Sequence, residues 1–321
     1  MTLPVTSLYL SENLDLDLKD VDLKKFTDEQ IISMFLSICE RSKYTLRNYT
    51  NAIHQFQQFI APKTLQDATW REIEAFKIGL MKGFCSKSSR PQAPATVSNL
   101  IAPLRSLYRW GSDPNIGLFA HNPTTCIRSP KVRVNSSQHY LTKKEVVRLF
   151  EQLYLQGERD YLVGVTLVLL GLRVSELVAI RVGDFHTDPL ETSMWLTVVY
   201  GKGGKQREVK VPQSLWNILH GFILKTRKGR QQRLFPISVR QVERIIQTAR
   251  EQSGLEKKLT PHWLRHTNAT LALLNGASIQ QVQEMLGHAQ INTTQRYIHT
   301  VEQIKKAASD YVEDCLKEYI L

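Results

Sequence analysis

Residues 260–276, TPHWLRHTNATLALLNG, carry the clearest helix signal in the second half of the chain, and the other elements of this half can be placed around it. Thr260 stands before a proline, the usual order of residues where a helix begins. Gly276 follows the last apolar residue, where helices commonly end. The stretch therefore predicts one helix with a defined start and stop.

The letters HWLRH inside this helix allow three interpretations. His262 and His266 are four residues apart and share a helix face, which is the spacing of a zinc-binding HExxH motif. However, Trp263 stands where that motif has glutamate, and Arg265 lies between the two histidines. The stretch is thus an altered metal site, a pair of structural histidines, or a site that needs an arginine more than a metal.

The segments around this helix predict a mixed domain over residues 141–321. A glycine, Gly171, interrupts a long apolar helical run. The arms SMWLTVV and QREVKVP flank a turn rich in glycine and lysine, which predicts a β-hairpin. Further helices are expected from Thr142, over VRQVERIIQTAREQSG, over SIQQVQEML and in the C-terminal tail. The expected fold class is mostly α with a small antiparallel β-sheet in the C-terminal domain.

The first half of the chain predicts an all-helical domain of four helices over residues 27–126. Thr27 and Gln30 form a capping box at its first helix. An acidic leader over residues 1–26 precedes the domain, and a linker rich in proline, asparagine and serine follows it over 127–140. Aromatic residues recur at helical spacing, which is typical of core packing.

Charge and composition indicate what kind of partner the protein binds and in which cell compartment it works. The 321 residues carry a formal charge of +12, which favours a polyanion such as nucleic acid. We find neither a signal peptide nor an apolar run long enough to cross a membrane. The four cysteines are scattered and form no CxxC pair, so we expect free thiols and a cytoplasmic protein.

Six residues that are ordinary when taken singly form a specific series when taken together. Each of them alone fits a surface, turn, cap or core position. In chain order they are Arg173, Lys202, His262, Arg265, His288 and Tyr297. The stretches GLRVSEL, GKGGKQR, TPHWLRHT and LGHAQINTTQRYIH, which contain them, resemble those of the tyrosine recombinase (phage integrase) family. The helical half is similar to the core-binding domain of that family, so the resemblance covers essentially the whole chain.

The resemblance implies cleavage and rejoining of DNA through a 3′-phosphotyrosyl intermediate, with Tyr297 as the nucleophile. Arg173 and Arg265 would hold the non-bridging phosphate oxygens, a task for which planar guanidiniums suit better than ammonium groups. This fixed positive charge would take the place of a metal ion. The covalent link stores the energy of the broken bond, so neither ATP nor any other cofactor is expected.

The remaining site residues would handle protons and orientation. Lys202 in the hairpin turn is the expected general acid for the leaving 5′-oxygen. His262 and His288 would bind the phosphate and accept or relay the tyrosine proton. Glu176, three residues after Arg173, would orient that arginine on the same helix face.

The expected partners are double-stranded DNA and further copies of the chain, with no membrane. By resemblance, four protomers would assemble on two DNA sites, with or without a second recombinase. The tail would dock on a neighbouring protomer, and packing on its own domain is the alternative. The basic residues proposed to face DNA are Arg41, Lys43, Arg47, Lys87, Arg105, Arg128, Lys131, Arg133, Lys205 and Arg207. For those of the helical domain, a face that only meets solvent is the alternative.

Several functions remain open from the sequence. We expect no arm-binding domain before residue 27, which favours an Xer-like or Cre-like enzyme acting at short sites. A mobile-element integrase or excisionase with the same chemistry is the first alternative. A catalytically silent DNA-binding regulator is less favoured, because all six positions carry the expected residue types. A zinc enzyme built on HWLRH lacks its glutamate, and Arg265 would repel a cation.

Overall fold

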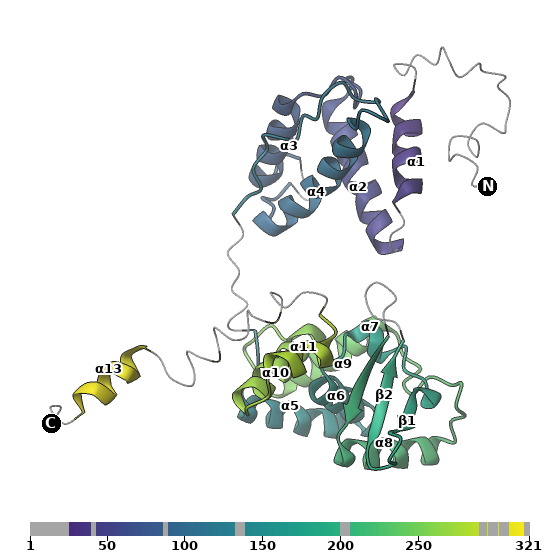
Figure 1. Cartoon of the computed structure of the whole chain (residues 1–321), viewed down its shortest axis with the longest axis vertical. Coiled ribbons are helices and arrows are strands. Elements are labelled where there is room, and N and C mark those ends of the chain that lie inside the picture. The colour runs from purple at the N-terminus through teal and green to yellow at the C-terminus, as the bar shows by residue number, and fades with distance from the viewer. Residues whose placement is uncertain are drawn as a thin grey trace. The chain divides into compact units, whose positions relative to one another are not determined.

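The computed structural model divides the chain into two compact units, residues 1–133 and 134–321 (Figure 1). Each unit is described by itself. The residues that the structure describes are 26–39, 43–85, 89–131, 139–199, 206–288, 294, 301 and 308–317.

The first unit is a helical bundle. Its described elements are α1 (Asp28–Ile38), α2 (Lys43–Ile60), α3 (Trp70–Lys82) and α4 (Pro94–Gly111). Their apolar faces meet in one core, in which the rings of Phe56 and Phe76 lie edge to face at 5.3 Å. Tyr108 is buried there and donates its hydroxyl to the Leu65 carbonyl at 2.9 Å, so its polar end is satisfied.

The ends of these helices follow from local sequence. The capping box predicted for Thr27 and Gln30 is confirmed, since each side chain bonds the backbone N–H of the other residue. Gly111 is the last residue of α4. A Cβ there would lie 2.4 Å from the ring of Phe119, so close packing of an aromatic ring accounts for this glycine.

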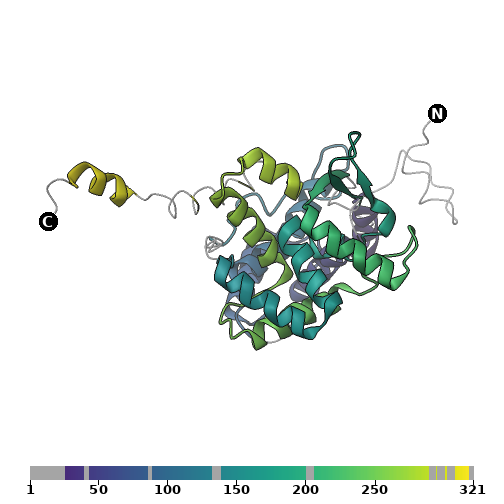
Figure 2. The ribbon, with the colours of Figure 1, turned by 90° about the horizontal axis from the view of Figure 1, so that it is seen from below.

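The second unit combines helices with a small sheet (Figures 1 and 2). Its described helices are α5 (Lys143–Gln156), α6 (Glu158–Leu170), α7 (Val174–Leu177), α8 (Gln213–Thr226), α9 (Val239–Gln252), α10 (Pro261–Leu274), α11 (Ile279–Leu286) and α13 (Ala308–Leu316), with a 3-10 turn η4 at Val182–Asp184. Helix α6 is central, because it packs on α5, α8, α9 and α10. Its residues are buried nearly all round, which explains why it reads as a continuous apolar run.

The described strands form one antiparallel sheet in the order β1 (Phe185–Thr187), β2 (Met194–Val198), β3 (Arg207–Val211). Leu196 pairs with Val209, and both are buried. Successive residues of a strand point to opposite faces, so Arg207 and Val211 lie on the same inner face as Val209. The start of β3 thus carries a charged side chain toward the core.

The predicted fold class is confirmed: the described residues form a helical N-terminal bundle and a mostly helical second unit with a small antiparallel sheet. The predicted hairpin matches β2 and β3. Strand β1 and helix α8 were not predicted. Among the described residues, no helix is both long enough and apolar enough to cross a membrane.

Candidate functional site

The turn after α6 places Arg173. Gly171 ends this helix in the left-handed conformation, with φ +58°. A Cβ at this position would lie 2.7 Å from Asn268 Oδ1 and 2.8 Å from a methyl group of Leu286. Only glycine meets both demands without strain. The turn therefore packs tightly against α10 and α11, and Arg173 follows it as the N-cap residue of α7.

The carboxylate of Glu176 is the centre of a cluster of arginines. Its side chain is 0% exposed. Oε2 accepts the backbone N–H of Arg173 at 2.8 Å, and Oε1 accepts Nη1 of the same arginine at 2.7 Å. The contact predicted between these two residues is present, but its geometry differs. Arg173 has extended backbone before the helix, so the two side chains do not share a helix face.

Two further guanidiniums complete the cluster. Arg207 donates two parallel hydrogen bonds to Glu176, from Nη1 to Oε1 at 2.9 Å and from Nη2 to Oε2 at 2.7 Å. Nη1 of Arg265 lies 4.0 Å from Oε2. Burial raises the pKa of the Glu176 carboxyl, but the hydrogen bonds from Arg207 and Arg173 outweigh it and hold the pKa below its usual value. Glu176 is therefore an ionised carboxylate at neutral pH.

Arg265 lies on α10 with 2% of its side chain exposed. Nη1 donates to the carbonyl of Gly171 at 2.6 Å, and Nη2 donates to the carbonyl of Leu286. Leu286 is the last residue of α11, whose final carbonyls have no partner inside the helix. The guanidinium thus binds carbonyl groups at the C-terminal ends of α6 and α11, where a positive charge is favourable.

Three histidines lie beside these arginines. The rings of His262 and His266 meet edge to face at 4.3 Å. Burial, then the charges of Arg265 and Arg173, lower the pKa of His262. Burial and the same two charges lower the pKa of His288 to about 4, and Nδ1 of His288 lies 2.9 Å from Thr294 Oγ1. These histidines are therefore neutral at neutral pH.

The structure brings four of the six predicted catalytic residues together. Arg173 and Arg265 share Glu176 as a neighbour, and the charges of both act on His262 and His288. Lys202 and Tyr297 lie outside the described residues, as do four of the predicted DNA-facing residues, Arg41, Lys87, Arg133 and Lys205. Lys43 is the first residue of α2.

The other DNA-facing candidates of the first unit fall into two groups. Arg47, Arg128 and Lys131 are exposed to solvent. Arg105 instead donates to Ser129 Oγ at 2.8 Å and to the Ile127 carbonyl at 2.6 Å. That arginine fastens the segment after α4 to its own helix.

Arg207 was proposed to face DNA, but its side chain points into the protein. Its side chain is 11% exposed. Besides the two bonds to Glu176, Nε donates to the Met285 carbonyl at 2.9 Å. All three guanidinium nitrogens are thus used within the protein. The alternation of residues along β3 could have predicted this burial, because Arg207 shares the inward face of Val209 and Val211.

Asn268 and His139 were not singled out from the sequence. Nδ2 of Asn268 donates to the carbonyls of Val168 and Leu169 at 2.8 and 3.0 Å, at the end of α6. His139 stacks on Trp263 with ring centroids 4.5 Å apart. Asn268 follows Arg265 by three residues, so the helix period predicts one face for both. No local pattern marks His139.

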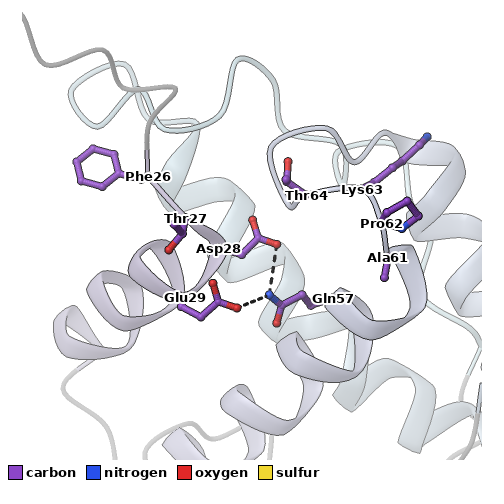
Figure 3. A pocket seen from close by; sticks show the side chains of 9 residues that line it. All are labelled: Phe26, Thr27, Asp28, Glu29, Gln57, Ala61, Pro62, Lys63 and Thr64. Carbon is purple, nitrogen blue, oxygen red and sulfur yellow. Dashed lines mark hydrogen bonds between the residues drawn. The ribbon is translucent and has the colours of Figure 1, made fainter.

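One pocket, of about 370 Å³, lies in the first unit and contains none of the predicted site residues (Figure 3). Gln57 bridges two acidic residues there, donating to Asp28 at 3.4 Å and to Glu29 at 3.0 Å. Asp28 also accepts the backbone N–H of Leu65 at 3.0 Å. These bonds tie α1 to α2 and to the loop after it. Within the described part of the chain, no three His, Cys, Asp or Glu side chains are grouped to hold a metal ion.

Comparison with known proteins agrees in both units. Residues 139–303 match the phage integrase family, and residues 32–113 match the N-terminal SAM-like domain of phage integrases. A tyrosine recombinase of Pseudothermotoga lettingae is 32% identical over 82% of this chain and 90% of its own. The XerD tyrosine recombinase of Listeria innocua is 30% identical over 81% of this chain and 89% of its own.

Solved structures share the fold. The XerH site-specific recombinase in a post-cleavage complex with a palindromic difH substrate aligns with a TM-score of 0.67 and 18% identity, covering 91% of this chain and 85% of its own. A lambda integrase dimer bound to a COC′ core site aligns with a TM-score of 0.66 and 21% identity, covering 92% and 81%. Family matches in both units, relatives at 30% identity or more and a shared fold lead to one conclusion: the chain belongs to the phage integrase family and is a site-specific tyrosine recombinase, an enzyme that breaks and rejoins DNA.

Proposed function

We propose that this recombinase cuts each DNA strand with Tyr297 and exchanges strands between short recombination sites. Residues 141–321 would carry the chemistry, and residues 27–126 would clamp the DNA, with 127–140 as the linker. One observation supports this most directly. Arg173 and Arg265, which are far apart in the sequence, both lie beside the buried carboxylate of Glu176, with Nη1 atoms 2.7 and 4.0 Å from its oxygens. Their charges also lower the pKa of His262 and His288.

The proposed cleavage step is a transfer of the phosphoryl group. The Tyr297 oxygen attacks the scissile phosphorus, and the bond to the 5′-oxygen of the next nucleotide breaks. Lys202 donates a proton to that leaving oxygen. The product is a 3′-phosphotyrosyl link and a free 5′-hydroxyl. Attack by the 5′-hydroxyl of a partner strand reverses the step and completes the exchange, so no ATP is consumed.

The arginines would stabilise the negative charge that builds on the phosphate oxygens. Arg173 keeps 28% of its side chain exposed, so a phosphate can approach it directly. Arg265 is 2% exposed and would act first as a buried positive charge beneath the site. Because Arg265 is buried, direct contact between its guanidinium and the phosphate would require the site to rearrange when DNA binds. Two fixed guanidiniums supply the charge for which other nucleases use a metal ion.

The histidines would serve as neutral groups. A neutral imidazole has one nitrogen that can accept a proton and one that donates a hydrogen bond. The lowered pKa values of His262 and His288 keep both in that form at neutral pH. Either one can then take the Tyr297 proton while the other binds the phosphate. Glu176 would hold the Arg173 guanidinium in place throughout.

We further propose that four copies act together on two DNA duplexes in the cytoplasm. A lambda integrase tetramer bound to a Holliday junction is among the structural neighbours. Helix α13 leaves Tyr311, Val312 and Leu316 exposed, at 61%, 57% and 47%. This apolar face suits docking on a neighbouring protomer. Val301, in the same C-terminal tail, is buried in the core of its own unit.

Covalent capture tests the proposal. Nicked duplexes cut from the genomic neighbourhood trap the intermediate, because the short fragment beyond the cut diffuses away. The wild-type enzyme should form a covalent adduct, and sequencing of the captured ends would identify the site. Tyr297→Phe should bind the same duplex and form no adduct, since it lacks only the attacking oxygen. An adduct that survives this substitution would place the nucleophile elsewhere.

A further inference from the structure

Arg207 uses its whole guanidinium for hydrogen bonds inside the protein, whereas a DNA-facing residue would direct it to solvent. Its fork binds Glu176 through two hydrogen bonds, and Nε binds the Met285 carbonyl. Such paired bonds fix the direction of a guanidinium as well as its position. The side chain is therefore held by three hydrogen bonds to two partners and is 11% exposed.

The contacts of Arg207 connect three separate parts of the site. It is the first residue of β3, at the base of the hairpin whose turn contains Lys202 in the sequence. Through Glu176 it reaches Arg173. Through Met285 it reaches the end of α11, three residues before His288.

The stem of this side chain is also packed. A Cβ built on Gly287 would lie 2.8 Å from Cδ of Arg207. Gly287 ends α11 with φ +65°, so its backbone turns directly against the arginine. Glycine at this position allows the close approach that the left-handed turn requires. The side chain of Arg207 therefore connects the base of the hairpin to the turn at Gly287, which precedes His288.

We propose that Arg207 is a positioning residue for strand cleavage, one that fixes the Arg173 guanidinium through Glu176 and fastens the hairpin base to the turn that precedes His288. This inference rests on the catalytic roles proposed above. Arg207 itself would touch no phosphate, because all three of its guanidinium nitrogens bind groups of the protein.

The charge balance around Glu176 explains why the effect reaches Arg173. The buried carboxylate accepts two hydrogen bonds from the guanidinium of Arg207, one from Nη1 of Arg173 and one from the backbone N–H of Arg173. Without Arg207, the carboxylate loses two of these four hydrogen bonds. A buried charge that loses its partner strongly destabilises the protein. The remaining neighbour, Arg173, would be drawn further onto Glu176 and away from the phosphate. Positioning errors of this kind, about 1 Å, can lower a reaction rate on the order of a hundredfold.

The experiment separates binding from chemistry. Arg207→Gln and Arg207→Lys are compared with Lys210→Gln, which removes a charge from an exposed position of the same strand. The probe is the nicked duplex that the wild-type enzyme captures. We expect both Arg207 variants to form the adduct at least about tenfold more slowly at saturating DNA, with nearly unchanged affinity. Lys210→Gln should match the wild-type rate.

The lysine variant separates a loss of positioning from a loss of folding. It keeps the positive charge, and its melting curve can be compared with that of the wild type. A folded Arg207→Lys with the full wild-type rate would overturn the proposal, because a point charge would then suffice. A second contrary result is loss of affinity with an unchanged saturated rate, accompanied by a decrease of about one in the slope of affinity against salt. That result would make Arg207 a phosphate contact.

A double substitution tests whether the effect passes through Glu176. If it does, Arg207→Gln combined with Glu176→Gln should cleave little more slowly than the slower single variant. Rate losses that multiply would overturn the pathway. Absence of any adduct from the wild-type enzyme would overturn the catalytic proposal itself. That outcome is distinct, because there the Lys210→Gln control fails as well.

Discussion

The Arg265 guanidinium donates a hydrogen bond of 2.6 Å to the carbonyl of Gly171, a residue 94 positions earlier in the chain. The same glycine turn leads directly into Arg173. One backbone turn therefore supports both arginines of the site. Any change that displaces it should affect stability and cleavage together.

Gly171→Ala is the sharpest test of this shared support. The left-handed φ of +58° disfavours alanine, and its Cβ would press on Asn268 and Leu286 at 2.7 and 2.8 Å. We expect the free energy of unfolding to fall by about 2–5 kcal/mol, the sum of backbone strain and overpacking. Urea denaturation measures this loss, and adduct formation should slow in parallel.

Gly254→Ala is the matched control. Gly254 also has a left-handed φ, +65°, but a Cβ there meets nothing within 4 Å. It should therefore show the backbone strain alone, about 1–2 kcal/mol, with normal cleavage. Equal losses in the two variants would mean that the close approach at Gly171 contributes nothing.

Helices with local signals could be predicted from the sequence, and segments defined by distant contacts could not. Thr27, Thr142 and Ser278 each form the capping box that their spacing predicts. Thr260 stands at the predicted N-cap of α10, yet its side chain makes no capping bond. Strand β1 has three residues and depends on pairing with β2, so no periodicity of its own could reveal it.

The site shows the same division. The resemblance to the tyrosine recombinases led to Arg173, Glu176, His262, Arg265 and His288, which the structure brings together. The partners of Arg265 are backbone carbonyls of Gly171 and Leu286. Carbonyls carry no signature in a sequence, because every residue has one. For this reason the sequence could suggest which charges matter but could not predict what holds them.

Replacing Arg173 by lysine tests whether geometry matters beyond charge. Lysine keeps the positive charge but cannot bind Glu176 and a phosphate with a planar fork. We expect Arg173→Lys to bind DNA nearly as well as the wild type and to cleave about 10²–10³-fold more slowly, the typical cost of one lost transition-state donor. Single-turnover adduct formation at saturating DNA measures this rate.

Arg159→Lys provides the comparison for that substitution. Arg159 lies on α6 with half of its side chain exposed, paired with Asp160 at 2.8 Å. Exposed pairs of this kind contribute little to stability. The control should keep both affinity and rate. Near-normal cleavage by Arg173→Lys would argue against a bidentate role.

Chelation distinguishes the recombinase chemistry from the zinc alternative. The proposed step uses fixed guanidinium charge, so adduct formation should proceed unchanged in excess EDTA. The zinc reading of HWLRH makes the opposite prediction, namely loss of activity that added zinc restores. Wild-type enzyme dialysed against EDTA and assayed on the captured duplex gives the answer. The same assay in the presence of zinc completes the comparison.

Acidification should destabilise the fold through its buried histidines. Burial, then the charge of His262, lowers the pKa of His266 to about 4 from an ordinary value of 6.5. His288 is lowered to about 4 as well. Below pH 6.5 the unfolded chain takes up protons at both positions while the folded chain does not. Protons then favour unfolding, so stability is full above pH 6.5 and declines as the pH falls toward 4.

Urea denaturation between pH 7.5 and 5.5 measures this slope before most carboxylates begin to titrate. Each histidine can add at most about 1.4 kcal/mol per pH unit, the value for one whole proton. Partial exposure should keep the observed slope below that ceiling. His266→Gln removes one proton acceptor from the unfolded chain, so its stability should depend less on pH than that of the wild type. An unchanged slope in His266→Gln would show that this ring takes up no extra proton on unfolding, and that its burial beside His262 does not oppose its charge.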